Sequence, residues 1–108
     1  MRVLFVCGQN RLRSPTAEQV FADWPGIEVA SAGVKHQAGV PGTPQLLAWA
    51  DLVLVMEPAH RRQLATRFGA HLRGTRIACL GIPDIYRFME PALVERLLRV
   101  VPAYLRRG

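Results

Sequence analysis

Short apolar runs that alternate with helical patterns are the feature that most constrains how this chain can fold. The clearest run is Leu52–Val55, and the four candidate strands are residues 2–6, 27–31, 51–56 and 76–80. The runs are apolar on both faces, which is typical of parallel strands that helices cover on each side. The sequence therefore predicts an α/β fold: a small, doubly wound, four-stranded parallel sheet with helices on both faces.

Helical patterns fill the intervals between these runs. The first helix is expected to have Ser14 as its N-cap and Pro15 at its first position, and to end at Pro25 and Gly26. Further helices are expected at 43–50, at 58–72 and from about Pro91, with Pro102 kinking or fraying the last one. The predicted buried stripe of this last helix is Leu93, Val94, Leu97, Leu98, Val101 and Leu105.

Length and composition favour one folded domain over residues 1–108. The chain is 50% hydrophobic and 20% charged, which excludes global disorder. Its two cysteines cannot form a disulfide framework, and its scattered histidines complete no zinc pattern, so no metal site is predicted. The apolar run at the N-terminus is too short for a signal peptide or a membrane span, which favours a cytoplasmic protein with no membrane partner.

The net charge of +6 comes mainly from arginines, since all but one of the 14 basic residues are of this type. Several of them recur at helical spacing in 61–76 and 96–107, where a solvated helix face is the simpler interpretation. Aromatic residues do not interleave with them, so they favour nucleic acid only weakly. The positive balance nevertheless attracts acidic or phosphorylated ligands.

The segment from Cys7 to Ser14 links the first run to the first expected helix. In open α/β sheets, ligands bind at the carboxyl ends of the strands, near the point where the strand order reverses. A loop of this length can curl so that its N–H groups cradle an anion, and the helix N-terminus adds partial positive charge. Arg13 can complete the ring, because its planar guanidinium matches two phosphate oxygens. The predicted phosphate-binding residues are Gly8, Gln9, Asn10, Arg11, Leu12, Arg13 and Ser14.

Cys7 is the candidate nucleophile of this segment. The helix dipole, the loop amides and Arg13 all favour the thiolate, which is the reactive form. The hydroxyl of Ser14 can donate to the thiolate, cap the helix, or do both. Asn10 is expected to form hydrogen bonds with the loop backbone and so to hold the curvature of the loop. The alternative interpretation is that Cys7 is a small buried side chain and Arg13 a surface arginine.

The pattern Cys-x5-Arg-Ser-Pro, directly after Val-Leu-Phe-Val, resembles the opening signature of the low-molecular-weight protein tyrosine phosphatase family. The resemblance covers most of the chain, which we identify as a short member with a single phosphatase-like domain. Other parts that resemble the family are residues 16–18, 31–33, 50–56 with His60, and 82–86, where Asp84 stands in the place of the general acid.

The resemblance implies hydrolysis of a phosphomonoester in two steps through a cysteinyl-phosphate, with no metal or organic cofactor. Cys7 would attack phosphorus, Arg13 and the loop would hold the phosphoryl oxygens, and Asp84 would protonate the leaving oxygen. The expected substrate is a phosphorylated protein, phosphotyrosine first, or a small aryl phosphate. Tyr86 is the candidate for stacking on an aromatic substrate at the rim of the site, with packing as the alternative.

Several positions depart from the family pattern. Leu12 stands where the family usually carries a second cysteine, so this chain lacks the neighbouring thiol that can trap an oxidised nucleophile. Gln9 replaces a glycine, Arg11 adds a positive charge, and Ile85 replaces the proline after the acid. The chain is also shorter than family members, mainly between Gly33 and Ala50.

Other interpretations stay open at this point. Asp84 can serve only as a turn residue, and Cys79 is either a buried strand residue or a second redox thiol. His60 and His71 are expected to be exposed on a polar helix face. Two other functions fit the same loop: a non-catalytic module that binds phosphate, phosphoprotein or RNA, and a thiol-linked arsenate reductase with Cys79 as its relay.

Overall fold

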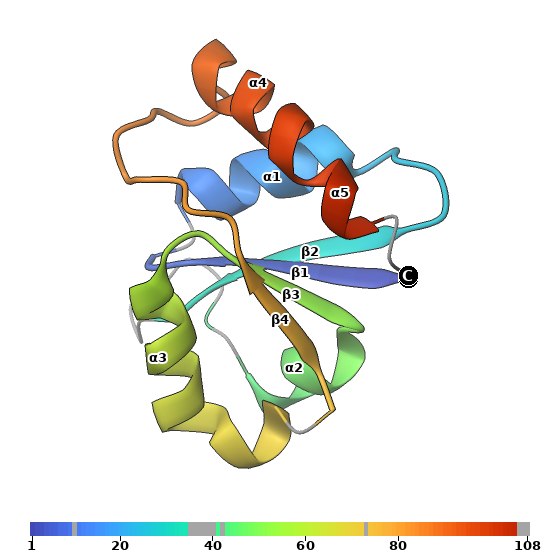
Figure 1. Ribbon diagram of the computed structural model, residues 1–108, viewed down its shortest axis with the longest axis vertical. Helices are drawn as coiled ribbons and strands as arrows, with labels where there is room; N and C mark the ends of the chain where they lie inside the picture. The colour runs from blue at the N-terminus through green and yellow to red at the C-terminus, as the bar shows by residue number, and fades with distance from the viewer. Residues whose placement is uncertain (10, 35–40, 42, 73, 106–108) are drawn as a thin grey trace.

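Four parallel strands form one sheet, as the sequence predicts, in the order β2-β1-β3-β4 (Figure 1). In the computed structural model, the described residues are 1–9, 11–34, 41, 43–72 and 74–105. The strands are β1 (Arg2–Cys7), β2 (Glu28–Gly33), β3 (Leu52–Val55) and β4 (Arg76–Cys79). The helices are α1 (Arg13–Phe21), α2 (Pro44–Trp49), α3 (Pro58–Phe68) with the short 3-10 helix η1 (Gly69–Leu72), α4 (Pro91–Val100) and α5 (Pro102–Leu105).

The sheet separates two apolar clusters, because the side chains of each strand alternate between its faces. Val3, Phe5 and Cys7 of β1 pack with α1 and α4 on one face. Leu4 and Val6 pack with α2 and α3 on the other face. Figure 1 shows the same two layers, with α1, α4 and α5 on one side of the sheet and α2 and α3 on the other. The doubly wound α/β architecture is therefore confirmed.

The first helix begins two residues earlier than predicted, at Arg13 instead of Pro15. Its N-cap is Leu12, and the Leu12 carbonyl accepts a hydrogen bond from the Thr16 N–H at 3.1 Å. The prediction of Ser14 as the N-cap is therefore wrong. Pro15 still fits, because the first N–H groups of a helix have no partner within it. Because Ser14 lies inside the helix and not at its N-cap, its hydroxyl contacts Cys7 at the end of β1.

The structure confirms the predicted cap of the second helix and the predicted effect of Pro102 on the last one. The Thr43 hydroxyl accepts from the Leu46 N–H at 3.1 Å and caps α2. Pro102 interrupts the last helix, which stops at Val100 and resumes as α5. Leu98 is 44% exposed, so its place in the predicted buried stripe is wrong, whereas Leu93 and Leu97 are fully buried.

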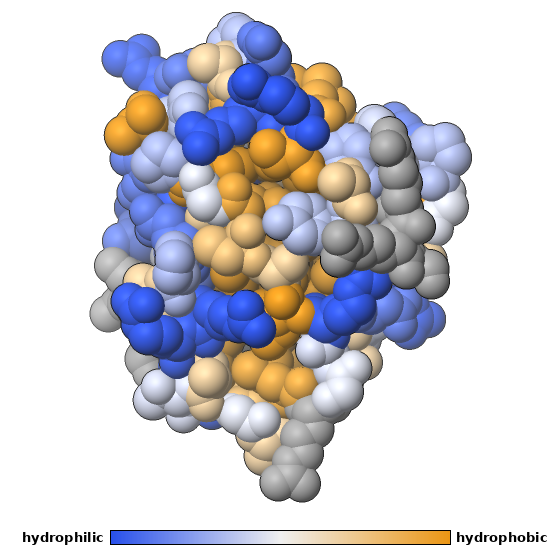
Figure 2. Space-filling model, viewed as in Figure 1, coloured by the Kyte–Doolittle hydropathy of each residue, from blue (hydrophilic) through white to orange (hydrophobic). Residues whose placement is uncertain are grey.

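Several arginines of the helices lie on the surface of the molecule. Figure 2 shows an apolar band on one face of the molecule, between groups of hydrophilic side chains. Arg61, Arg62 and Arg67 of α3 are exposed, and so is Arg99 of α4. These positions agree with a solvated helix face. Among the described residues, no helix has the length and apolar character that crossing a membrane requires.

Candidate active site

A cleft of about 470 Å³ opens at the carboxyl ends of β1 and β3. The chain places β2 on one side of β1 and β3 on the other, so the strand order reverses at this point. The cleft therefore lies where the sequence predicts a ligand site, and the loop after β1 faces the start of α3 across it. The residues that line the cleft are Cys7, Gly8, Gln9, Arg11, Leu12, Arg13, Glu57, Ala59, His60, Gln63 and Asp84.

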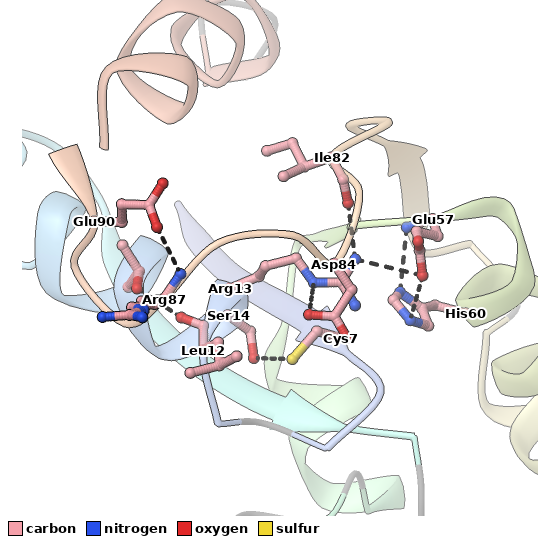
Figure 3. Close-up of polar contacts among 11 residues, drawn as sticks. Cys7, Leu12, Arg13, Ser14, Glu57, His60, Ile82, Asp84, Arg87 and Glu90 are labelled. Carbon is pink, nitrogen blue, oxygen red and sulfur yellow. Dashed lines mark hydrogen bonds and ion pairs between the residues drawn. The ribbon is translucent and has the colours of Figure 1, made fainter. Parts of the chain in front are cut away.

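Cys7 is the last residue of β1, and its side chain reaches the floor of the cleft with 3% of its surface exposed. The Sγ atom lies 2.9 Å from Ser14 Oγ, a hydrogen-bond contact that Figure 3 shows. Ser14 is fully buried in the first turn of α1. A thiolate at this position would accept from the Ser14 hydroxyl and face the positive end of the helix dipole.

Arg13 lies beside Cys7 with only 5% of its side chain exposed. Its Nη1 donates to the Ile82 carbonyl at 2.8 Å and lies 3.4 Å from Glu57 Oε2. Its Nε lies 3.6 Å from Asp84 Oδ1 (Figure 3). A buried charge is stable only when such partners replace its water. These contacts fix the guanidinium on the wall of the cleft, next to the thiol.

Asp84 joins the cleft from the segment that follows β4. Its side chain is 62% exposed, and it meets Arg13 at the edge of the cavity. The structure thus brings together the three predicted catalytic residues, Cys7, Arg13 and Asp84, although they are separated by 77 positions in the sequence at the widest (84 minus 7).

Glu57 and His60 also line the cleft, although no pattern in the sequence predicted a role for them there. His60 is only 4% exposed, so the expectation of an exposed histidine is wrong. Its Nδ1 accepts from the Glu57 N–H at 3.2 Å, and its Nε2 lies 3.4 Å from Glu57 Oε2. Glu57 therefore joins the histidine to Arg13. The signal in the sequence is the three-residue spacing of a reciprocal helix cap, with Pro58 at the first helical position.

The rest of the loop surrounds the cavity. Gly8, Gln9, Arg11 and Leu12 all line it, and Gln9 and Arg11 are exposed. Asn10 lies outside the described residues, so the cradle of loop amides remains a prediction. Tyr86 lies elsewhere: its ring packs against the cluster around α1 and α4, and its hydroxyl accepts from Arg96 Nη1 at 3.2 Å.

Neither of the two cysteines, both in the described part of the chain, forms a disulfide, and the sheet separates them. Cys7 packs in the cluster with α1 and α4, whereas Cys79 packs in the cluster with α2 and α3. A disulfide between them would require one side chain to cross the sheet. Within the described part of the chain, no group of three His, Cys, Asp or Glu residues could hold a metal ion.

The chain is similar in sequence and in fold to known phosphatases. No family model matches the chain. It is 35% identical to the protein-arginine-phosphatase of Bacillus subtilis (strain 168), over 66% of this chain and 65% of that protein. It therefore spans just under two thirds of that relative's length.

A second relative, the probable low-molecular-weight protein-tyrosine-phosphatase EpsP of Ralstonia nicotianae, is 28% identical, over 88% of this chain and 85% of that protein. Among solved structures, the tyrosine phosphatase Wzb from Escherichia coli K30, in complex with phosphate, superimposes with a TM-score of 0.77 at 25% identity, over 98% of this chain and 96% of that one. With the fold and the loop after β1, these similarities support the resemblance to the low-molecular-weight protein tyrosine phosphatase family that the sequence indicates.

Proposed function

We propose that this protein is a cysteine-dependent phosphatase that hydrolyses phosphomonoesters of protein side chains, phosphotyrosine first. The observation that carries the proposal is the meeting of Cys7, Arg13 and Asp84 in one cleft. A nucleophile, a fixed cation and an acid at the mouth are the groups that phosphoryl transfer to a thiol requires.

In the first step, the Cys7 thiolate attacks phosphorus in line with the leaving oxygen. The S–P bond forms, the P–O bond breaks, and protonated Asp84 gives its proton to the departing oxygen. Arg13 and the loop amides hold the equatorial oxygens, whose charge grows in the transition state. In the second step, Asp84 takes a proton from water, the water oxygen attacks phosphorus, and the S–P bond breaks to release phosphate.

The contacts of Arg13 suit this role. Nη1 and Nε already engage the Ile82 carbonyl, Glu57 and Asp84, which fixes the plane of the guanidinium before a ligand arrives. A guanidinium has five N–H donors in a rigid fork, so it retains donors for two phosphate oxygens. Preorganisation of this kind spares the reaction the cost of ordering the cation during the chemical step.

The substrate class rests on the relatives and on the rim of the cleft. The two curated relatives are named as a protein-arginine phosphatase and a protein-tyrosine phosphatase, which supports a phosphorylated protein as substrate. Leu12 lines the cleft and is 37% exposed, so it offers apolar surface to the body of an aromatic side chain. We therefore place phosphotyrosine ahead of phosphoarginine for this chain.

Hydrolysis of p-nitrophenyl phosphate by the wild type, Cys7→Ser and Asp84→Asn tests the mechanism. We expect no turnover with Cys7→Ser and a loss of about 100-fold or more with Asp84→Asn. Cys79→Ser and Asp23→Asn are the matched controls, because Cys79 lies across the sheet and Asp23 is exposed after α1. Wild type that binds vanadate without turnover would refute the proposal and indicate a phosphate-binding module. Peptides bearing phosphotyrosine or phosphoarginine then decide the substrate.

A further inference from the structure

The segment between β4 and α4, residues 80–90, carries Asp84 without a helix or strand around it. An acid on such a segment must still be held within a fraction of an ångström of the leaving oxygen to transfer a proton. Asp84 is 62% exposed, and its ion pair with Arg13 spans 3.6 Å. The rest of its positioning must come from the backbone on either side of it.

The two ends of this segment are anchored to the body of the fold. The Leu80 N–H donates to the Val55 carbonyl at 2.8 Å, and the Ile82 N–H donates to the Met56 carbonyl at 2.8 Å. At the other end, the Met89 N–H donates to Thr16 Oγ1 at 2.9 Å. These contacts extend the sheet up to residue 82 and fix the return toward α4, which leaves the stretch around Asp84 between them.

Arg96 of α4 spans that stretch with one guanidinium. Its Nη2 donates to the Gly81 carbonyl at 3.0 Å, and its Nη1 donates to the Tyr86 hydroxyl at 3.2 Å. The first contact lies before Asp84 in the chain and the second lies after it. Because the guanidinium is planar and rigid, the two contacts fix the separation of the points they join.

The helix that supplies Arg96 is itself firmly packed. Leu93 and Leu97 flank Arg96 in α4 and are fully buried against the sheet. Arg96 lies in a second hollow with Tyr86 and Arg99, apart from the cleft that contains Cys7. It can therefore influence the reaction through the position of the segment and not by touching the substrate.

We propose that Arg96 is a positioning residue for the general acid Asp84, acting through Gly81 and Tyr86. This inference rests on the proposed function, in which Asp84 protonates the leaving oxygen. It also gives Tyr86 a role: its ring packs against the core, and its hydroxyl holds the segment.

The leaving group separates this role from a merely structural one. Phenolate is a strong base and needs a proton as it departs, whereas 2,4-dinitrophenolate is stable without one. A displaced Asp84 therefore slows attack on phenyl phosphate and leaves attack on 2,4-dinitrophenyl phosphate nearly unchanged. The ratio of the two kcat/KM values reports this, because kcat/KM covers the steps up to departure of the leaving group.

The experiment compares Arg96→Met with Arg99→Met, an exposed arginine on the same helix. We expect Arg96→Met to lower kcat/KM for phenyl phosphate about tenfold and for 2,4-dinitrophenyl phosphate less than about twofold, since a general acid contributes about 100-fold or more in full. Inhibition by inorganic phosphate should not change, because the loop after β1 is intact. Arg99→Met should match the wild type with both substrates.

Two further variants keep the test decisive if Arg96→Met folds poorly. Tyr86→Phe removes only one of the two contacts and keeps the ring, so we expect a smaller loss with the same selectivity for phenyl phosphate. Arg96→Lys should restore part of the loss. Equal losses with both substrates, or no loss in Arg96→Met and Tyr86→Phe, would overturn the inference.

Asp84→Asn distinguishes failure of this inference from failure of the proposed function. A selective loss with phenyl phosphate in Asp84→Asn, but not in Arg96→Met, leaves Asp84 as the acid and removes only the role of Arg96. If Asp84→Asn shows no selectivity, the assignment of the acid fails, and the inference about Arg96 fails with it.

Discussion

Replacing Ser14 by alanine removes the hydroxyl that lies 2.9 Å from Cys7 Sγ. Both residues are buried, with 0% and 3% of their surface exposed, so water cannot take the place of the lost donor. A hydrogen bond to a charged group contributes about 1.5–3 kcal/mol to stability. Since about 1.4 kcal/mol corresponds to a factor of ten, the loss of this contact should slow the reaction of Cys7 as a nucleophile by about tenfold to 100-fold.

Alkylation by iodoacetamide measures this change directly, because only the thiolate reacts. The assay uses a Cys79→Ser background, so that Cys7 is the remaining thiol. In this background, we expect Ser14→Ala to react at least about ten times more slowly than the protein with Ser14.

Ser31→Ala is the matched control for loss of a buried hydroxyl. Ser31 is 6% exposed, but its hydroxyl donates to Glu18 and not to the thiol. An alkylation rate that stays within about twofold of the wild type in Ser14→Ala would refute the reasoning, given the strength of such a bond. An equal fall in Ser31→Ala would do the same, because the effect would then come from packing in general.

Three further predictions follow from the same structure. Glu57→Gln removes a partner of buried Arg13, and should cost about 0.5–1 kcal/mol because Glu57 is itself partly exposed; thermal denaturation should show a melting temperature several degrees lower, and an unchanged one would contradict this. Peroxide should inactivate the wild type in a way that dithiothreitol reverses poorly, whereas Leu12→Cys should regain activity, since a neighbouring thiol can trap the oxidised Cys7; full recovery of the wild type would show the reasoning to be wrong. Phe21→Ala removes a fully buried ring from the core, so urea denaturation should show a free energy of unfolding lower by about 3–5 kcal/mol. A decrease of less than about 1 kcal/mol would contradict this prediction.

The elements that the sequence predicted well are those with local causes. Thr43 and Pro44 define the start of α2 through a cap and a fixed φ, and Pro102 ends a helix because it lacks an N–H. The start of α1 was missed by two residues, because Leu12 has no side chain that can cap a helix. There the loop after β1 decides the boundary, and no local signal marks it.

The misassigned residues have tertiary causes. His60 carries the polarity of a surface residue, but its ring is buried and contacts Glu57, which also pairs with Arg13 of α1. Leu98 fits the helical stripe by spacing, yet α4 packs on the sheet through Leu93 and Leu97 and leaves Leu98 exposed. Hydrophobic periodicity gives the direction of a stripe, whereas its width depends on the surface that it meets.

The sequence by itself determined the parallel sheet, the place of the segment from Cys7 to Ser14 after β1, and the family that the chain resembles. These follow from short-range patterns, in which neighbouring residues fix the strand, the loop and the helix. Only the tertiary structure showed that Glu57, after β3, pairs with Arg13, and that Arg96 of α4 holds the segment around Asp84 from a separate hollow. Parallel strands bring their carboxyl ends to one edge of the sheet, whatever their separation along the chain. The packing of the folded chain therefore determines which side chains meet, and the spacing of residues in the sequence could not reveal these contacts.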